Sequence, residues 1–239
     1  QDAGDTIPSN INICFEGSTY CLGIDARHRL TDAAGFNWNI SDDGTTCSST
    51  DFLITTWQTT TANESITIPT TGSGYDYNID WGDGTLEIGV TGNATHEYAI
   101  AGTYIVKING DFPRIFFNNR GSRNKILTIE QWGIITWESM AQAVNGCTNL
   151  KLNATDQPDL SLVTDASRLF AKITNFEDIG GAIGQWNTGI IDTMNAMFIE
   201  SGFNENIGNW NVSKVTNFDG MFYLCPNFDQ DLGIWDISE

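Results

Sequence analysis

The sequence predicts a mainly β protein with short helices, in which a β-sandwich is followed by a solenoid of stacked repeats. Two observations predict this class. Between residues 51 and 120, short β-branched and aromatic segments alternate partly with polar residues and are separated by Gly, Asn and Pro. After residue 121, similar phrases return about every 24 residues, a period typical of proteins whose repeats stack to bury their apolar faces.

Six segments of residues 51–120 are expected to be the antiparallel strands of the sandwich, because each is short and partly alternating. Residues 1–50 are richer in Asp, Ser, Thr and Gly, and they are expected to form a loop-rich segment with a few short strands. The six predicted strands are FLITTW, ESITIP, YDYNIDW, TLEIGV, HEYA and TYIVKI.

Regularly spaced aromatic and methionine side chains mark the repeats of residues 121–239. Trp186 and Trp210 stand 24 residues apart, and a Met-Phe pair returns after the same interval. Each repeat is expected to hold one short strand around its tryptophan and one helical turn around a segment such as NFDGMFYL (217–224). At a fixed period, these side chains are expected to form a buried core ladder rather than platforms for sugars. The predicted ladder consists of Trp186, Trp210, Trp235, Met197, Phe198, Met221 and Phe222.

Two motifs carry resemblances to known families. A W-G-D-G turn at residues 81–84 and an H-x-Y-x-x-x-G-x-Y pattern at 96–104 resemble a polycystic-kidney-disease-type (PKD) domain. The repeats resemble those of the BspA-like bacterial surface proteins, with the leucine-rich-type pattern W-D-V-S-x-V-T-x-M-x-x-M-F. Phe218 stands where that pattern has Met, and Gly189-Ile190 replaces Ser-x-Val.

These resemblances imply a PKD/immunoglobulin-like sandwich at 51–120 and a leucine-rich-repeat-like solenoid at 121–239. They also imply a secreted or cell-surface protein that acts in adhesion or protein contact, with no known reaction. Residues 1–50 lie outside both resemblances.

Charge and hydropathy narrow the expected partners. The net charge is −19 with only 11 Lys and Arg, so nucleic acid and anionic membranes are expected to be repelled. No apolar run approaches the roughly 18 residues that span a bilayer, so membrane insertion is not expected. Protein partners or surface glycans, and an extracellular or cell-surface location, fit this composition better.

The W-G-D-G turn also raises the question of chemistry. Asp80 and Asp83 are the calcium candidates, but their spacing does not match an EF-hand, and a hairpin turn is the favoured interpretation. His96 is expected to pack on a strand rather than act as a base. No GxSxG, HExxH, P-loop or GxGxxG motif accompanies these residues, so the chain is expected not to be an enzyme and to use no cofactor beyond calcium.

Five cysteines leave two interpretations open. Cys14, Cys21 and Cys47 crowd the first fifty residues and are disulfide candidates, with free buried thiols as the alternative. Cys147 and Cys225 lie in the repeats. The odd number leaves at least one cysteine free or paired with another chain.

The end of the sequence suggests assembly. It stops at GIWDISE, partway through a repeat, and no polar cap follows Trp235. This predicts either a piece of a longer array or a head-to-tail filament in which the N-terminal segment of one copy covers the last repeat of the next. The leading function is therefore a structural or adhesive surface protein. The alternative is an accessory carbohydrate-binding module of a larger secreted protein.

Overall fold

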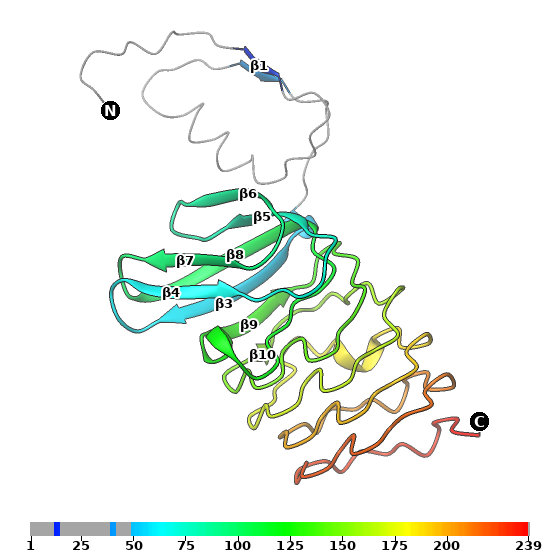
Figure 1. Cartoon of the computed structure of the whole chain (residues 1–239). Coiled ribbons are helices and arrows are strands. Elements are labelled where there is room, and N and C mark those ends of the chain that lie inside the picture. Colours follow the sequence, from blue (N-terminus) through cyan, green and yellow to red (C-terminus); the bar gives the residue numbers. More distant parts are fainter. Residues whose placement is uncertain (1–11, 15–38, 42–48, 239) are drawn as a thin grey trace, which may run out of the picture. The chain divides into compact units, whose positions relative to one another are not determined.

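The structure is a computed structural model that describes residues 12–14, 39–41 and 49–238 (Figure 1). The chain divides into two units, Gln1–Asp51 and Phe52–Glu239. In the first unit, β1 (Asn12–Cys14) pairs in parallel with β2 (Asn39–Ser41), and a 3-10 helix, η1, covers Ser49–Asp51. All other elements belong to the second unit.

The second unit begins with strands that alternate buried and more exposed side chains. In β3 (Leu53–Thr59), every second residue from the first to the last is buried, as expected for a strand with one face on a core. All six segments of residues 51–120 predicted as strands are strands, and the mainly β prediction is confirmed. After β3 they are β4 (Glu64–Ile68), β5 (Asp76–Asp80), β6 (Leu86–Val90), β7 (Ala94–Tyr98) and β8 (Gly102–Asp111). The short strands predicted around the repeat tryptophans are wrong, because no described strand contains Trp186, Trp210 or Trp235.

The larger sheet is mixed and has the strand order β10-β9-β3-β8-β5-β6. A 3-10 helix, η2 (Gly121–Asn124), leads into β9 (Ile126–Gln131), which pairs antiparallel with β3 and parallel with β10 (Lys151–Leu152). The strands β4 and β7 form a separate antiparallel pair. The larger sheet therefore runs past residue 120, and the division into two domains at that residue stays a prediction.

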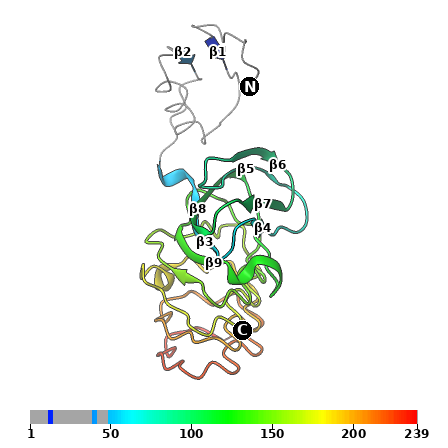
Figure 2. The same ribbon diagram turned by 90° about the vertical axis from the view of Figure 1, so that its left-hand side faces the viewer.

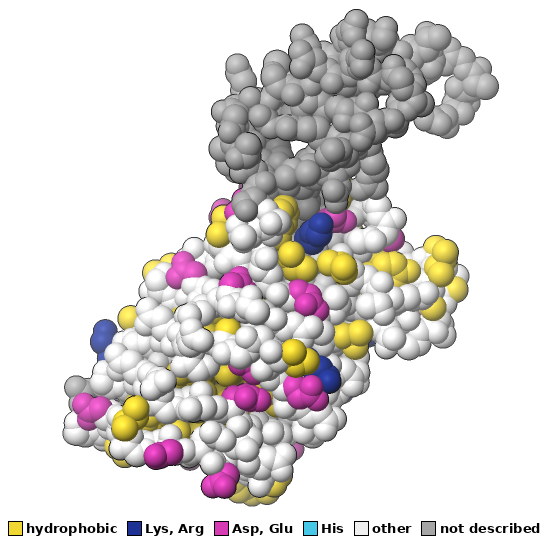
Figure 3. All heavy atoms as spheres, turned by 180° about the vertical axis from the view of Figure 1, so that it is seen from behind, with side chains coloured by type: hydrophobic (Ala, Val, Ile, Leu, Met, Phe, Trp, Pro, Cys, Tyr) yellow, Lys and Arg dark blue, Asp and Glu magenta, His cyan; other side chains and the backbone are white. Residues whose placement is uncertain are grey.

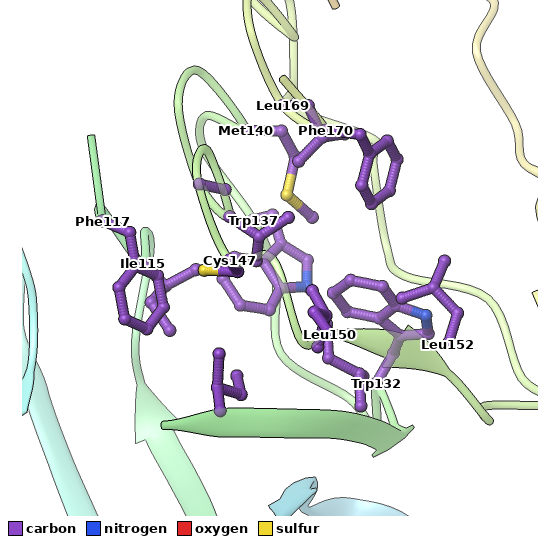
Figure 4. Close-up of a cluster of buried hydrophobic side chains, with 14 of the residues drawn as sticks. Ile115, Phe117, Trp132, Trp137, Met140, Cys147, Leu150, Leu152, Leu169 and Phe170 are labelled. Carbon is purple, nitrogen blue, oxygen red and sulfur yellow. The ribbon is translucent and has the colours of Figure 1, made fainter. Parts of the chain in front are cut away.

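One hydrophobic core runs from the larger sheet into the repeats. Trp132, directly after β9, packs edge to face with Trp137 at 5.9 Å and with Trp186 at 5.5 Å between ring centroids. Figure 4 shows Trp137 between Phe117, which follows β8, and Phe170 of the repeats. Aromatic pairs of this kind add about 0.5–1.5 kcal/mol each beyond the burial of their area, so they tie the sheet to the repeats.

Four segments of the repeat region stack through their backbones, and we call them the ladder segments. In the first three, N–H groups of alternate residues donate to carbonyls of the next segment, as Phe198 does to Met221 at 2.9 Å. The N–H groups between them bond back within their own turn, as Met197 does to Met194 at 3.2 Å. Figure 2 shows the successive turns of this region lying against one another. The ladder segments are 140–146, 166–172, 194–200 and 218–224.

The helical turn predicted at residues 217–224 is wrong. Beyond β9, the only helix in the described chain is a 3-10 turn, η3 (Ile183–Gln185). Each ladder segment instead contains two residues, four apart, with left-handed backbones. This geometry turns alternate N–H groups toward the next segment, whereas an α-helix would bond them to its own carbonyls four residues back. The left-handed pairs are Gln142 with Gly146, Arg168 with Lys172, Ala196 with Glu200, and Gly220 with Leu224.

The left-handed position of Leu224 offers a direct test of this geometry. Its φ is +54° and its side chain is 60% exposed, while the equivalent residue of the first ladder segment is Gly146. A left-handed backbone costs an L-residue about 1–2 kcal/mol of stability. Replacing the residue with glycine removes this cost but lowers the stability by about 0.4–1 kcal/mol, because glycine makes the unfolded chain more flexible. We therefore expect Leu224→Gly to stabilise the protein by about 0.5–1 kcal/mol in chemical denaturation.

The adjacent residue supplies the control for that experiment. Tyr223 is 62% exposed and does not have a positive φ, so Tyr223→Gly gains no relief of strain. We expect the Tyr223→Gly variant to be less stable than wild type by about 0.5–1 kcal/mol. Equal losses from both glycine substitutions would contradict the left-handed assignment at Leu224.

The chain that leaves β8 covers the first ladder segment. Three of its donors point at the carbonyls of that segment in the register that the later segments use among themselves, and the N–H of Asn118 donates in addition to the Gln142 carbonyl at 3.2 Å. Of the three donors in register, two are backbone N–H groups and one is a guanidinium group. The contacts are Phe117 N to Ala143 O at 3.2 Å, Asn119 N to Asn145 O at 2.9 Å, and Arg114 Nη2 to Ala141 O at 2.9 Å.

Candidate functional site

The W-G-D-G turn joins β5 to β6 and is held by its own hydrogen bonds. Asp80 Oδ1 accepts the N–H of Gly82, and Asp83 Oδ1 accepts the N–H of Thr85, both at 2.9 Å. The N–H of Trp81 donates to the Thr85 carbonyl at 3.0 Å. The two aspartates thus use carboxylate oxygens to accept from the turn that carries them.

His96 of β7 packs on this turn. Its ring stacks on Trp81 with centroids 5.1 Å apart, and its Nε2 lies 2.7 Å from Asp83 Oδ2. Trp81 is fully buried and donates its indole N–H to Glu87 Oε1 at 3.1 Å. The hydroxyl of buried Tyr98 donates to the Trp81 carbonyl at 2.9 Å. The cluster links the hairpin of the larger sheet to the β4–β7 pair.

The electrostatics of the turn keep Asp83 charged. Partial burial alone would raise the pKa of this carboxyl, but hydrogen bonds from His96 and Thr85 outweigh burial and lower it. Calcium takes about six to eight oxygen ligands. Over the described ranges, no group of three or more His, Cys, Asp or Glu side chains is arranged to hold a metal ion. Calcium at Asp80 and Asp83 stays a prediction.

Asp83→Asn tests the turn. The amide still accepts the Thr85 N–H, but it removes the charge beside His96, so we expect a loss of about 0.5–1 kcal/mol at neutral pH. Because the folded-state pKa is lowered, this contribution is present above the unfolded pKa of about 3.9 and is lost as the pH falls through the folded value. Calorimetry from neutral pH to about pH 3 measures it.

The same calorimetry, run with and without calcium chloride, addresses the metal. We expect wild type and Asp83→Asn to respond alike to calcium. A calcium-dependent stabilisation of the wild type that the variant lacks would assign a calcium site to Asp83.

The cysteines of the repeats are buried thiols. Cys147 and Cys225 are free, and burial raises the pKa of both, strongly for Cys147. A thiol with a raised pKa is a poor nucleophile at neutral pH, so neither position favours thiol chemistry. Cys21 and Cys47 lie outside the described residues, and Cys14 is described only through the backbone of β1.

The predicted ladder residues include aromatic rings that stack in parallel between repeats. The rings of Trp186 and Trp210 are 6.4 Å apart and inclined by 12°, and those of Phe198 and Phe222 are 5.6 Å apart and inclined by 7°. Five ladder residues that a neighbouring repeat covers are 4% exposed or less: Trp186, Trp210, Met197, Phe198 and Met221. Phe222 and Trp235, in the last described repeat, are only partly buried.

That last repeat presents an open apolar surface, which we call the terminal face. It contains a pocket of about 470 Å³. Tyr223 and Ile237 at its edge are 62% and 71% exposed. The pocket is lined by Phe218, Gly220, Met221, Phe222, Tyr223, Trp235 and Ile237.

The backbone of the terminal face is also unpaired. In the part of the chain that the structure describes, four N–H groups of the last ladder segment have no hydrogen-bond partner. Their equivalents in the three earlier segments all donate to a following segment. The unpaired donors are those of Phe218, Gly220, Phe222 and Leu224.

Acidic side chains outnumber basic ones in the last described repeat. Between residues 214 and 238, one lysine, Lys214, stands against four exposed aspartates. Hydrogen bonds from the Ser238 hydroxyl and N–H hold the pKa of Asp236 below its ordinary value. Figure 3 likewise shows more acidic than basic side chains on the side of the molecule that it presents. The four aspartates are Asp219, Asp229, Asp231 and Asp236.

A family model described as "Mycoplasma protein of unknown function, DUF285" matches residues 138–239. The match contains all four ladder segments and leaves the strands β3 to β9 outside it. No curated protein and no solved structure matches the chain. Among the helices of the described residues, none combines the length and apolar character needed to cross a membrane.

The aromatic ladder was predictable from the sequence, but the row of backbone N–H donors in the ladder segments was not. The direction of a backbone N–H is not encoded in side-chain periodicity, so aromatic spacing does not reveal it. One weak signal was present: Gly146 and Gly220 occupy the two left-handed positions in different repeats. Glycine favours such backbones, and two glycines in related phrases therefore hinted at a non-helical turn.

Proposed function

We propose that the chain is a structural or adhesive protein of the cell surface or extracellular space that acts through protein–protein contacts. In this proposal the strands of residues 51–120 are a PKD/immunoglobulin-like sandwich. The ladder segments belong to a leucine-rich-type solenoid of the BspA-like kind. No catalysis and no cofactor is assigned to it.

The observation that carries the proposal is the stack of ladder segments. Their backbone hydrogen bonds and aromatic rings continue from one repeat to the next. Stacked repeats of this kind create extended surfaces on which other proteins bind. The acidic surface supports the proposal because it steers contacts toward proteins with basic patches.

Adhesion can be measured with beads that carry the full chain, applied under flow to immobilised proteins and to passivated polymer. We expect retention on protein surfaces that exceeds retention of beads carrying an inert protein of similar charge. Equal retention of both bead types on every surface would contradict an adhesive role.

Two further forms of the proposal are separated by simple measurements. In the carbohydrate-binding alternative, the partly exposed rings of Tyr223 and Trp235 stack on sugars, and glycan-array binding lost in Tyr223→Ala would support it. In the self-assembling form, copies join head to tail into a filament, and light scattering grows with concentration. The N-terminal segment that this form uses lies largely outside the described residues.

A further inference from the structure

We infer that Ser122 of η2 and Lys125 cover the outer edge of β4 and thereby prevent this strand from pairing with β4 of a second copy. We call these two side chains the edge cover. The edge cover is an inhibitory contact within the chain, and it goes beyond the adhesive role proposed above and does not depend on it. The inference rests on the geometry of the strand edge, on the side chains that occupy it and on the self-complementary register of β4.

The strand β4 has a strand neighbour on one side only in the described part of the chain. It pairs antiparallel with β7 over all five residues, and this pair is separate from the larger sheet. Alternate residues of a strand direct their backbone groups to opposite edges, and those of Ser65 and Thr67 lie on the edge away from β7. An uncovered edge of this kind is a template on which another strand can pair.

Two side chains take the place of a neighbouring strand at this edge. The Thr67 N–H donates to Ser122 Oγ at 3.0 Å, and Lys125 Nζ donates to the Ser65 carbonyl at 2.6 Å. The edge cover is also attached to β3, because the Gln58 N–H donates to the Lys125 carbonyl at 2.8 Å. One donor and one acceptor of β4 are therefore satisfied within the chain, and both must be released before another strand can use them.

An ion pair holds the lysine at the edge. Lys125 Nζ lies 2.8 Å from Glu64 Oε1, and the two side chains are only 26% and 23% exposed. The Lys125 ammonium, together with the Thr60 N–H, lowers the pKa of Glu64 to about 2, so this carboxylate is charged at neutral pH. Glu64 Oε2 also accepts the Thr60 N–H at 2.6 Å. The lysine is thus fixed by its backbone at β3 and by its ammonium at β4.

The groups under the edge cover are self-complementary, which identifies a second copy as the excluded occupant. When two copies of β4 lie antiparallel across a two-fold axis at Ile66, Ser65 of each copy lies opposite Thr67 of the other. The Thr67 N–H of one copy then meets the Ser65 carbonyl of the other. Glu64 lies opposite Ile68, so no like charges face each other within the pair of strands. Ile66 and Ile68 are fully buried in their own sandwich, so the pairing uses the backbone of β4 and leaves its core side chains in place.

Removal of both side chains in the full chain is the direct test. Ser122→Ala with Lys125→Ala should associate at a concentration about tenfold lower than wild type does, because wild type must first break two hydrogen bonds to free the edge. Sedimentation velocity over a concentration series measures this difference. Ser122→Ala alone uncovers only the Thr67 N–H and should have a smaller effect in the same direction, and it replaces the double variant if that variant does not fold. Association equal to wild type in the folded variants would overturn the inference.

Two further variants control for the loss of charge. Ser122→Thr with Lys125→Arg keeps a hydroxyl and a cation at the same positions and should associate as wild type does. Ser161→Ala with Lys151→Ala makes the same substitutions in the repeats, where Lys151 forms a comparable ion pair with Glu177 at 2.8 Å. This variant should also behave as wild type. If it associates as strongly as the variant without the edge cover, the lost charge and not the β4 edge is responsible, and the inference fails.

A proline in β4 identifies the edge through which the copies join. Thr67→Pro, added to the variant without the edge cover, removes the outward N–H and leaves the N–H groups that β4 directs at β7. Association should therefore be lost. Association that persists in this triple variant must use another surface, and this result would contradict the inference.

Amide exchange followed by NMR locates the contact without any substitution in β4. At low concentration the Thr67 N–H of the variant without the edge cover should exchange at least about tenfold faster than in wild type, because its acceptor is gone. Its protection should return as the concentration rises and the copies pair. Ile66, whose backbone is directed at β7, should change little. Protection of Thr67 that is the same at every concentration would overturn the inference, since the edge would then be closed without either side chain.

Discussion

Replacing Trp210 with alanine is expected to destabilise the protein by about 3–5 kcal/mol. The side chain is 3% exposed, stacks on Trp186 of the preceding repeat, and donates its indole N–H to the Ile183 carbonyl at 2.8 Å. Removing it leaves a cavity in the repeat core and removes one of the two hydrogen bonds to the Ile183 carbonyl, which still accepts the N–H of Trp186. For a chain of this size the loss corresponds to a fall in Tm of roughly 6–20 °C, measurable by circular dichroism.

The equivalent tryptophan of the next repeat is the control. Trp235 makes the same bond, from its indole N–H to the Ile207 carbonyl at 3.1 Å, but it is only partly buried. Trp235→Ala should therefore lower Tm much less than Trp210→Ala. If Trp210→Ala unfolds at the wild-type temperature, the buried core ladder is not what stabilises the repeats.

Gly82→Ala is expected to destabilise the protein by about 2–5 kcal/mol for a different reason. Gly82 has a φ of +78°, and a Cβ there would lie 2.4 Å from the Ile105 carbonyl oxygen of β8. The left-handed backbone contributes about 1–2 kcal/mol, and the overlap with a strand that cannot move freely contributes about 1–3 kcal/mol. Urea unfolding measures the sum.

Gly72 separates the two contributions. Its φ is +86°, but a Cβ at that position would meet nothing within 4 Å. Gly72→Ala should therefore cost only the backbone strain, about 1–2 kcal/mol. Equal losses in Gly72→Ala and Gly82→Ala would show that β8 yields to the added methyl group and does not hold the turn tightly.

The strands were predictable because burial on one face leaves a period of two in the sequence. In β3 the alternation of apolar and polar residues that predicted the strand matches the alternation of buried and more exposed side chains in the fold. The partner of β9 was not predictable in this way. Which strand it joins is decided by long-range packing, with Ile126 fully buried against the sheet, and not by its own composition.

The backbone of the repeat turns, in contrast, was not predictable from the sequence. The segment 217–224 was predicted as a helical turn, although its Gly220 already favours other backbones. The actual backbone depends on hydrogen bonds to neighbouring repeats, which outweigh local propensity. Similarly, Asp83 and His96 were each considered as candidate site residues, but the sequence did not predict their contact at 2.7 Å. That contact requires β7 to lie beside the β5–β6 hairpin.

The four left-handed pairs recur at unequal intervals, and this has a consequence for how such a chain can evolve. From Gln142 to Arg168, Ala196 and Gly220 the spacing is 26, 28 and 24 residues, yet each pair keeps the same separation of four. Added or deleted residues are therefore absorbed in the connecting loops, where doubling the length costs only about 0.6 kcal/mol. A duplicated gene segment that preserves one ladder segment needs no particular length between its ends, so an array of this kind can grow by unequal recombination while each new copy drifts in its loops and keeps its place in the stack.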